Sequence, residues 1–206
     1  ITPAAPDKRG GEIMLMGGNR DYLNAHGRWG GTFGRTGLLF DFMRKQGDGS
    51  RENTSHQLND WNAKSVTALN DRHTLGLRFN AYTEDSNLTY TGLRQDEWDR
   101  GPRRNPFKND YFYINRYAAA VTHTWAITPN LVMSNAAYSA MFFRDWWRQS
   151  SNSGQRPNDA SDPACGGMQN LNTTCGNEGR LRSYYTWGID PKFKAMHRLF
   201  GVRSEA

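Results

Sequence analysis

Apolar and polar side chains alternate along most of the chain with a period of two residues. Leu75, Leu77 and Phe79, for example, alternate with Arg78 and Asn80. No segment shows a sustained helical repeat of apolar positions. Because successive side chains of a strand point to opposite faces of a sheet, the pattern predicts an all-β chain with one apolar face and one polar face.

Eight strands and the start of a ninth are predicted. They cover residues 11–18, 21–31, 36–46, 57–69, 74–85, 111–125, 131–145 and 182–193, with the ninth beginning near 199. Several are longer than the usual 5–6 residues, and strands of about ten residues are typical of a tilted membrane crossing. The pattern therefore favours strands that cross an outer membrane.

Short and long connections alternate between these strands. The short ones lie at 32–35, 70–73, 127–130 and near His197, and the long polar ones at 47–56, 86–110 and 146–181. This alternation predicts an antiparallel up-and-down transmembrane β-barrel with tight turns on one side and large loops on the other. A soluble β-sandwich is the competing interpretation, although its loops are mostly short.

Composition narrows the class of protein. The chain has 206 residues, a formal charge of +6 and 36% hydrophobic residues. Its mean hydropathy is −0.84, and no uninterrupted apolar run approaches the roughly 18 residues of a membrane helix, which excludes helical membrane spans. Aromatic residues make up 13%, far more than disordered chains contain. The chain begins without Met and ends within an alternating pattern, so we expect it to be an internal segment of a longer protein.

Aromatic residues gather where three of the predicted strands meet the long linkers. We expect them to form a belt at the outer membrane interface. They are Tyr111, Phe112, Tyr113, Tyr117, Phe142, Phe143, Trp146, Trp147, Tyr184, Tyr185 and Trp187. A second set alternates with apolar positions and is hydrophilic, as expected for the wall of a wide, wet or plugged lumen. This set comprises Asp60, Asn62, Lys64, Arg78, Asn80 and Glu84.

No motif of an enzyme or of a resident cofactor is present. The five histidines are scattered, and no metal-ligand spacing occurs, so we expect neither catalysis nor a metal site. Cys165 and Cys175 are the only cysteines. A disulfide between them would contribute roughly 2–3 kcal/mol and implies an oxidising compartment. Two free thiols are the alternative.

Arginine is the distinctive residue, with 20 of the 26 basic side chains. One group lies in or beside the linker 86–110, together with an aromatic neighbour: Arg94, Trp98, Arg100, Arg103, Arg104 and Arg116. A second group lies in or beside the linker 146–181: Arg144, Arg148, Arg156, Arg180 and Arg182. Guanidinium groups bind carboxylates and phosphates bidentately, which suits a small, multiply charged anion. Pairing with neighbouring Asp and Glu, or with lipopolysaccharide phosphates, competes with this interpretation. The chain shows no nucleic-acid-binding fold.

Four segments resemble a known family. They are Gly17–Tyr22, Arg44–Gly49, the stretch from Tyr82 through Leu93 to Asp110, and Arg144–Gln149. Together they resemble the TonB-dependent outer-membrane receptors, and within these the ferric dicitrate receptor group. Residues 1–6 resemble the exit from the family's plug domain. The resemblance implies a partial barrel domain over residues 1–206, with the plug and the C-terminal part of a barrel of the 22-stranded type lying outside it.

The resemblance implies a function in the bacterial outer membrane. Receptors of this family import iron chelates actively, powered by a TonB energising complex that pulls on the plug. Iron is then the cargo, carried as a chelate, and no cofactor is needed. The arginines that best match the family's ligand contacts are Arg103, Arg104 and Arg116, with Arg94, Arg100 and Trp98 nearby. A passive porin or a surface adhesion barrel is the alternative.

Overall fold

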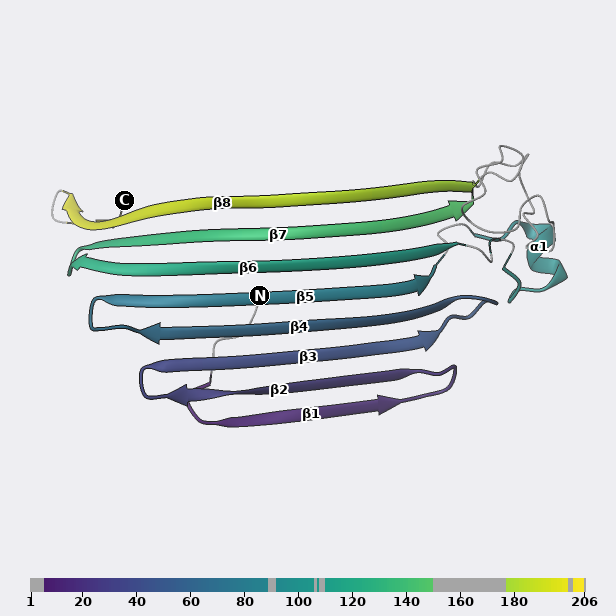
Figure 1. Cartoon of the computed structure of the whole chain (residues 1–206), viewed down its shortest axis with the longest axis horizontal. Helices are drawn as coiled ribbons and strands as arrows, with labels where there is room; N and C mark the ends of the chain where they lie inside the picture. The colour runs from purple at the N-terminus through teal and green to yellow at the C-terminus, as the bar shows by residue number, and fades with distance from the viewer. Residues whose placement is uncertain are drawn as a thin grey trace.

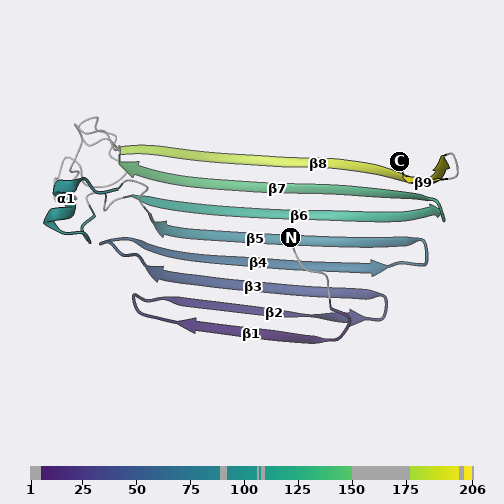
Figure 2. The same cartoon turned by 180° about the vertical axis from the view of Figure 1, so that it is seen from behind.

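The chain forms a single antiparallel sheet in which every strand pairs with its neighbours in sequence (Figure 1). The computed structural model describes residues 6–88, 92–105, 107, 110–149, 177–199 and 202–205. Within these, nine strands follow one another in the order β1 to β9 without a crossover, as Figure 2 shows from behind. The all-β, up-and-down architecture predicted from the alternation is confirmed.

The strands lengthen along the chain from β1 to β8, and β9 is short. Their bounds are β1 Gly10–Gly17, β2 Leu23–Phe33, β3 Thr36–Asp48, β4 Ser55–Ala68, β5 His73–Asn87, β6 Tyr111–Thr128, β7 Leu131–Gln149, β8 Asn177–Leu199 and β9 Val202–Glu205. Every predicted strand is present. The linker predicted at 47–56 is shorter, because β3 and β4 leave only residues 49–54 between them. Similarly, β8 begins at Asn177, five residues earlier than predicted.

The two ends of the sheet differ. At one end, here called the turn end, β2–β3, β4–β5 and β6–β7 are joined by tight turns. The turn between β2 and β3 contains Gly34 at φ +59°, a conformation that suits glycine in a two-residue hairpin. At the other end, the loop end, the connection 88–110 contains the short helix α1 Gln95–Arg100. No helix among the described residues is long and apolar enough to cross a membrane.

The register divides the strands into an apolar face and a polar face. Directly paired residues share a face, so Trp29, Phe40, Ala63, Phe79 and Ala119 form one row across the sheet. Large apolar side chains on this face are exposed: Ile13, Leu15, Trp29, Phe40, Trp61, Leu77, Phe79, Val121, Trp187, Ile189 and Phe193. The polar wall positions predicted from the sequence, such as Asp60, Asn62, Arg78 and Asn80, all lie on the opposite face. One side of the sheet is therefore suited to lipid and the other to water.

The aromatic residues predicted to form a belt lie at the expected end of the strands, but they are divided between the two faces of the sheet. All its members lie toward the loop end of β6–β8, as expected. The register, however, places Phe112, Phe142, Trp146 and Tyr184 on the polar face. Tyr111, Tyr113, Tyr117, Phe143, Trp147, Tyr185 and Trp187 lie on the apolar face. The difference arises because adjacent aromatic residues in a strand must point to opposite faces.

Candidate functional site

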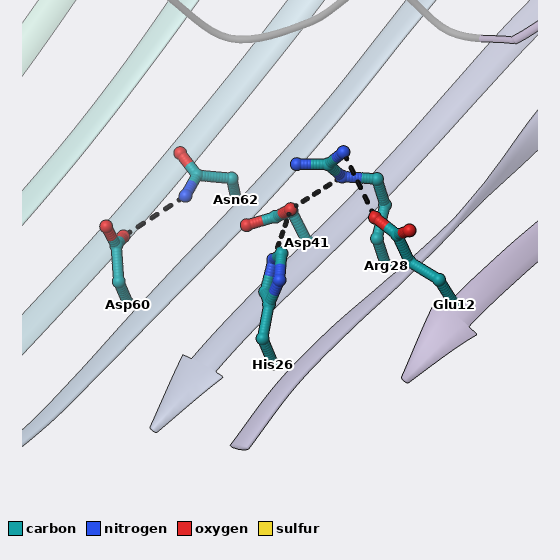
Figure 3. Close-up of polar contacts among 6 residues, drawn as sticks. All are labelled: Glu12, His26, Arg28, Asp41, Asp60 and Asn62. Atoms are coloured by element: carbon teal, nitrogen blue, oxygen red, sulfur yellow. Dashed lines mark hydrogen bonds and ion pairs between the residues drawn. The ribbon is translucent and has the colours of Figure 1, made fainter. Parts of the chain in front are cut away.

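The polar face carries linked hydrogen bonds across its first strands (Figure 3). Arg28 donates from Nε to Asp41 Oδ2 at 2.9 Å, and His26 Nε2 lies 2.9 Å from the same oxygen. Arg28 also donates from Nη1 to Glu12 Oε1 at 3.3 Å. The Asp41 side chain is only 18% exposed. Charges on this part of the wall are thus neutralised by one another.

A second set of polar contacts continues onto β4 and β5. Asn80, which is buried, donates from Nδ2 to Asp60 Oδ1 at 2.8 Å, and Asn62 Nδ2 donates to the same Asp60 oxygen at 3.1 Å. Nearer the loop end, Glu84 accepts hydrogen bonds from Tyr82 at 2.6 Å and Ser86 at 2.9 Å. These bonds run between neighbouring wall residues and hold the polar side chains in place.

Five of the six residues predicted to bind the anion lie in the connection 88–110. Arg94 precedes α1, Trp98 and Arg100 lie in it, and Arg103 and Arg104 follow it; all five are exposed. Arg100 donates from Nη2 to Asp96 Oδ2 at 2.7 Å, so for this residue the competing interpretation of local pairing holds. The side chains of Arg103 and Arg104 make no hydrogen bond or ion pair with the described part of the chain.

This connection is anchored to the turn between β3 and β4. The backbone N–H of Glu52 donates to the Arg103 carbonyl at 2.8 Å, and Asn105 Nδ2 donates to the Glu52 carbonyl at 2.9 Å. Asn105 is 3% exposed, and Phe107 is fully buried beside it. Helix α1 packs against none of the strands among the described residues. The backbone of Arg103 and the side chain of Asn105 therefore tie the segment that follows α1 to the neighbouring turn, while α1 itself lies beyond the end of the sheet (Figure 1).

Arg116 lies apart from the other five predicted residues. It is in β6, on the polar face, directly opposite Tyr82 of β5 and Phe142 of β7. Its guanidinium carbon lies 5.5 Å from the centroid of the Tyr82 ring, within the range of a cation–π contact. Arg116 thus lies in a strand, as the predicted strand 111–125 implies, and on the polar wall.

A compact arginine cluster, here called the loop-end cluster, surrounds Trp146 on the polar face of β7 and β8. The guanidinium carbons of Arg144, Arg148 and Arg180 lie 5.5, 5.3 and 5.9 Å from the centroid of its indole ring. Arg182 lies directly opposite Arg144. Like charges placed opposite each other destabilise a sheet pair, so this arrangement favours an anion between them.

Arg144 in the loop-end cluster has an unsatisfied donor. Its Nε is buried and has no hydrogen-bond partner among the described residues. Neither Arg144 nor Arg182 forms an ion pair with any described carboxylate. A buried N–H group without an acceptor is costly, and an anionic ligand would satisfy it. The sequence groups these arginines beside one linker, and the register adds that Arg144 and Arg182 are directly opposed.

The cysteines and the histidines are the other residues with reactive side chains. The proposed disulfide partners Cys165 and Cys175, and Arg156, lie outside the described residues. Two of the five histidines do come together on the apolar face near the turn end: His73 Nδ1 lies 2.9 Å from His123 Nε2. No group of three or more His, Cys, Asp or Glu side chains in the described segments could hold a metal ion.

No family model matches the sequence, and no curated protein is detectably similar to it. Solved structures do match the fold. The ferric citrate transporter FecA in its unliganded form superimposes with a TM-score of 0.76 at 16% identity over 99% of this chain. The siderophore receptor PiuA from Acinetobacter baumannii gives 0.76 at 11% identity, covering 98%. The open form of the ferric-catecholate import receptor Fiu from E. coli K12 gives 0.69 at 9% identity, also covering 98%.

The match extends over only part of these structures. The chain spans 28% of the FecA chain, 29% of PiuA and 33% of Fiu. These neighbours are iron-chelate transport receptors with a β-barrel fold. At such low identity the likeness establishes the fold alone. The chain has the fold of part of the barrel of a TonB-dependent outer-membrane receptor.

Proposed function

We propose that this chain is part of the barrel domain of a bacterial outer-membrane receptor that imports an anionic iron chelate, ferric citrate or a similar iron–carboxylate complex. The intact receptor contains a plug domain through which a TonB energising complex drives transport. In this proposal the apolar face contacts outer-membrane lipid and the polar face lines the lumen. Iron passes through as part of the ligand, and the protein needs no cofactor of its own.

The opposed pair Arg144 and Arg182 is the observation that supports an anionic ligand most directly. The two arginines face each other on the lumen side near the loop end, and a buried Nε of Arg144 lacks an acceptor in the described chain. Citrate-type chelates present several carboxylates, which guanidinium groups bind bidentately. Trp146, at the centre of the cluster, contributes a flat apolar wall.

The loop arginines give the proposal a second contact region. The side chains of Arg103 and Arg104 are exposed. Two hydrogen bonds to Glu52, one through the Arg103 carbonyl and one from the Asn105 side chain, anchor this segment to the neighbouring turn. We propose that they make the first contact with the chelate, with Arg94, Arg100 and Trp98 beside them, and that the loop-end cluster holds the chelate afterwards. Electrostatic attraction to a basic rim raises the rate of encounter with an anion.

The test uses the intact gene product expressed in a host that lacks its own ferric citrate receptors. Binding of radiolabelled ferric citrate is measured on energy-depleted cells, and uptake on energised cells. Arg144→Ala and Arg182→Ala are each expected to weaken binding about tenfold, the effect of losing one charge-assisted hydrogen-bonding group. Arg72→Ala, in the exposed turn between β4 and β5, is the matched control and should bind as the wild type does.

Each outcome separates this function from its alternatives. Uptake that continues after a protonophore collapses the energy supply would indicate a passive porin. A protein that neither binds nor imports the chelate, yet assembles normally in the membrane, would indicate a different ligand or an adhesion barrel. Unchanged binding in Arg144→Ala and Arg182→Ala, with import intact, would remove the loop-end cluster from the site.

A further inference from the structure

A hollow of about 600 Å³ lies on the polar face, centred on β4–β7. Its volume falls in the range of roughly 300–1,000 Å³ that is typical of small-molecule sites. Charged side chains line it, and its floor is formed by small residues: Ala118, Ala120 and Ala140. Neither Trp146 nor any of the four arginines around it lines the hollow, so this is a different place on the wall from the loop-end cluster.

The charges around this hollow are not equally neutralised. Arg28 is bonded to Asp41, and Asp60 accepts hydrogen bonds from Asn62 and Asn80. Asp41 and Asp60, the two carboxylates that line the hollow, are therefore already engaged with neighbours on the wall.

Two other arginines that line the hollow, Arg78 and Arg116, have no acceptor among the described residues. Arg78 makes no hydrogen bond or ion pair with these residues, and the guanidinium group of Arg116 lies over the Tyr82 ring. Guanidinium groups without an acceptor favour an anionic occupant of the hollow.

The floor of the hollow stays open because of the residues around it. Ala118 faces Ala140 directly, and Ala120 faces Tyr138. Tyr138 does not fill the space over Ala120, because its ring lies across Gly188 of β8: a Cβ atom at position 188 would lie 2.6 Å from Tyr138 Cζ. The wall therefore has a recess with two guanidinium groups at its edge.

We infer that this hollow is a second anion site, at which a carboxylate-bearing iron chelate is held within the lumen after it leaves the loop-end cluster. The inference rests on the proposed function. Arg78 and Arg116 would bind carboxylates of the chelate, and the alanine floor gives room for its body. Two basic sites at different heights let an anion move between them without passing through a region of unfavourable potential.

The experiment separates binding at the loop end from passage through the lumen. Two single variants are compared with the wild type: Arg78→Glu, which reverses a charge, and Ala120→Trp, which fills the floor of the hollow. For each, binding of radiolabelled ferric citrate is measured on energy-depleted cells and uptake on energised cells. Uptake should fall about tenfold, the loss expected when one charge-assisted contact is removed, while binding stays as in the wild type. Arg78→Lys keeps the charge and should retain most of the uptake.

Val121→Trp is the matched control, because Val121 follows Ala120 in β6 but lies on the apolar face and does not line the hollow. It adds the same ring at the same height and should import normally. Unheated gel migration confirms that each variant forms an assembled barrel. Arg78→Lys is compared in the same way if Arg78→Glu fails to assemble.

The results distinguish the inference from the function beneath it. A wild-type protein that neither binds nor imports ferric citrate overturns the proposed function and this inference together. Normal import in assembled Arg78→Glu and Ala120→Trp overturns the inference alone. An equal loss of binding and uptake would show that the hollow belongs to the same binding site as the loop-end cluster, and this result would also overturn the inference of a second site. Failure of both Arg78→Glu and Arg78→Lys to assemble would show that Arg78 binds a protein segment and not the chelate.

Discussion

Arg28 Nε and Asp41 Oδ2 lie 2.9 Å apart on directly opposed positions of β2 and β3. The same Asp41 oxygen lies 2.9 Å from His26 Nε2, so one carboxylate ties two residues of the neighbouring strand (Figure 3). The Asp41 side chain is only 18% exposed. Its removal would leave Arg28 Nε and His26 without this partner on a partly buried wall.

We expect Asp41→Ala to lower the free energy of unfolding by about 1–3 kcal/mol, because charge-assisted hydrogen bonds are lost at a partly buried site. Urea unfolding of the intact protein in detergent micelles, followed by tryptophan fluorescence, measures the change. Glu12→Ala is the control: Glu12 contacts the same arginine but is 64% exposed, so its loss should cost less than about 1 kcal/mol. Equal losses in the two variants would contradict the role assigned to Asp41.

The division into two faces predicts opposite effects at adjacent positions of β6. Val121 is 45% exposed on the apolar face, whereas Thr122 lies on the polar face opposite Gly76. Val121→Arg should destabilise the membrane-inserted barrel by about 2–4 kcal/mol if it lies near the bilayer centre, and Thr122→Arg much less. The assembled fraction on unheated gels reports the effect. The reverse order would show that the faces are exchanged.

The period-two pattern was enough to predict the strands because one face of each is apolar and the other is polar. The pattern fades where both faces meet water. The start of β8 at Asn177 follows a long polar linker, so the sequence placed the strand five residues too late. Helix α1 was missed because its six residues are too few to show a helical repeat. The presence of a strand can thus be predicted from the sequence, but the position of its end cannot where the strand extends beyond its alternating apolar residues.

The sequence indicated the chemistry of the candidate site better than its geometry. It singled out arginine and placed Arg116 in a predicted strand, but it did not give the residues that face each arginine. The register puts Arg116 opposite Tyr82 and Arg144 opposite Arg182. In hairpins with tight turns the turn fixes the register, but the long connection between β7 and β8 gives no such constraint that could be read from the sequence.

The anchor of the connection 88–110 should be sensitive to loss of Asn105. This side chain is 3% exposed, donates to the Glu52 carbonyl and accepts from the Phe107 N–H, both at 2.9 Å. Asn105→Ala loses both bonds, so the segment should open about tenfold more often. When trypsin, which cleaves after arginine, is added to intact cells, it should then cleave the protein faster after Arg103 and Arg104.

Gln95→Ala provides the control for this measurement, because Gln95 Nε2 bonds only the exposed Asp99 Oδ1, within the same helix. Its cleavage rate should match that of the wild type. If both variants are cut equally fast, the anchor at Glu52 does not limit opening of the loop.

The contact of Tyr138 with Gly188 gives a last prediction. Alanine at position 188 would place its Cβ 2.6 Å from Tyr138 Cζ, so the ring must move, whereas a Cβ at Gly27 of β2 would meet nothing within 4 Å. Gly27→Ala should stabilise the protein by about 0.4–1 kcal/mol through the unfolded chain, and overpacking should cancel or reverse this gain in Gly188→Ala. We therefore expect Gly188→Ala to be the less stable of the two in urea unfolding. In Gly188→Ala,Tyr138→Ala the clash is absent and the gain should return; if the gain is still missing there, the ring of Tyr138 is not what excludes a side chain at position 188.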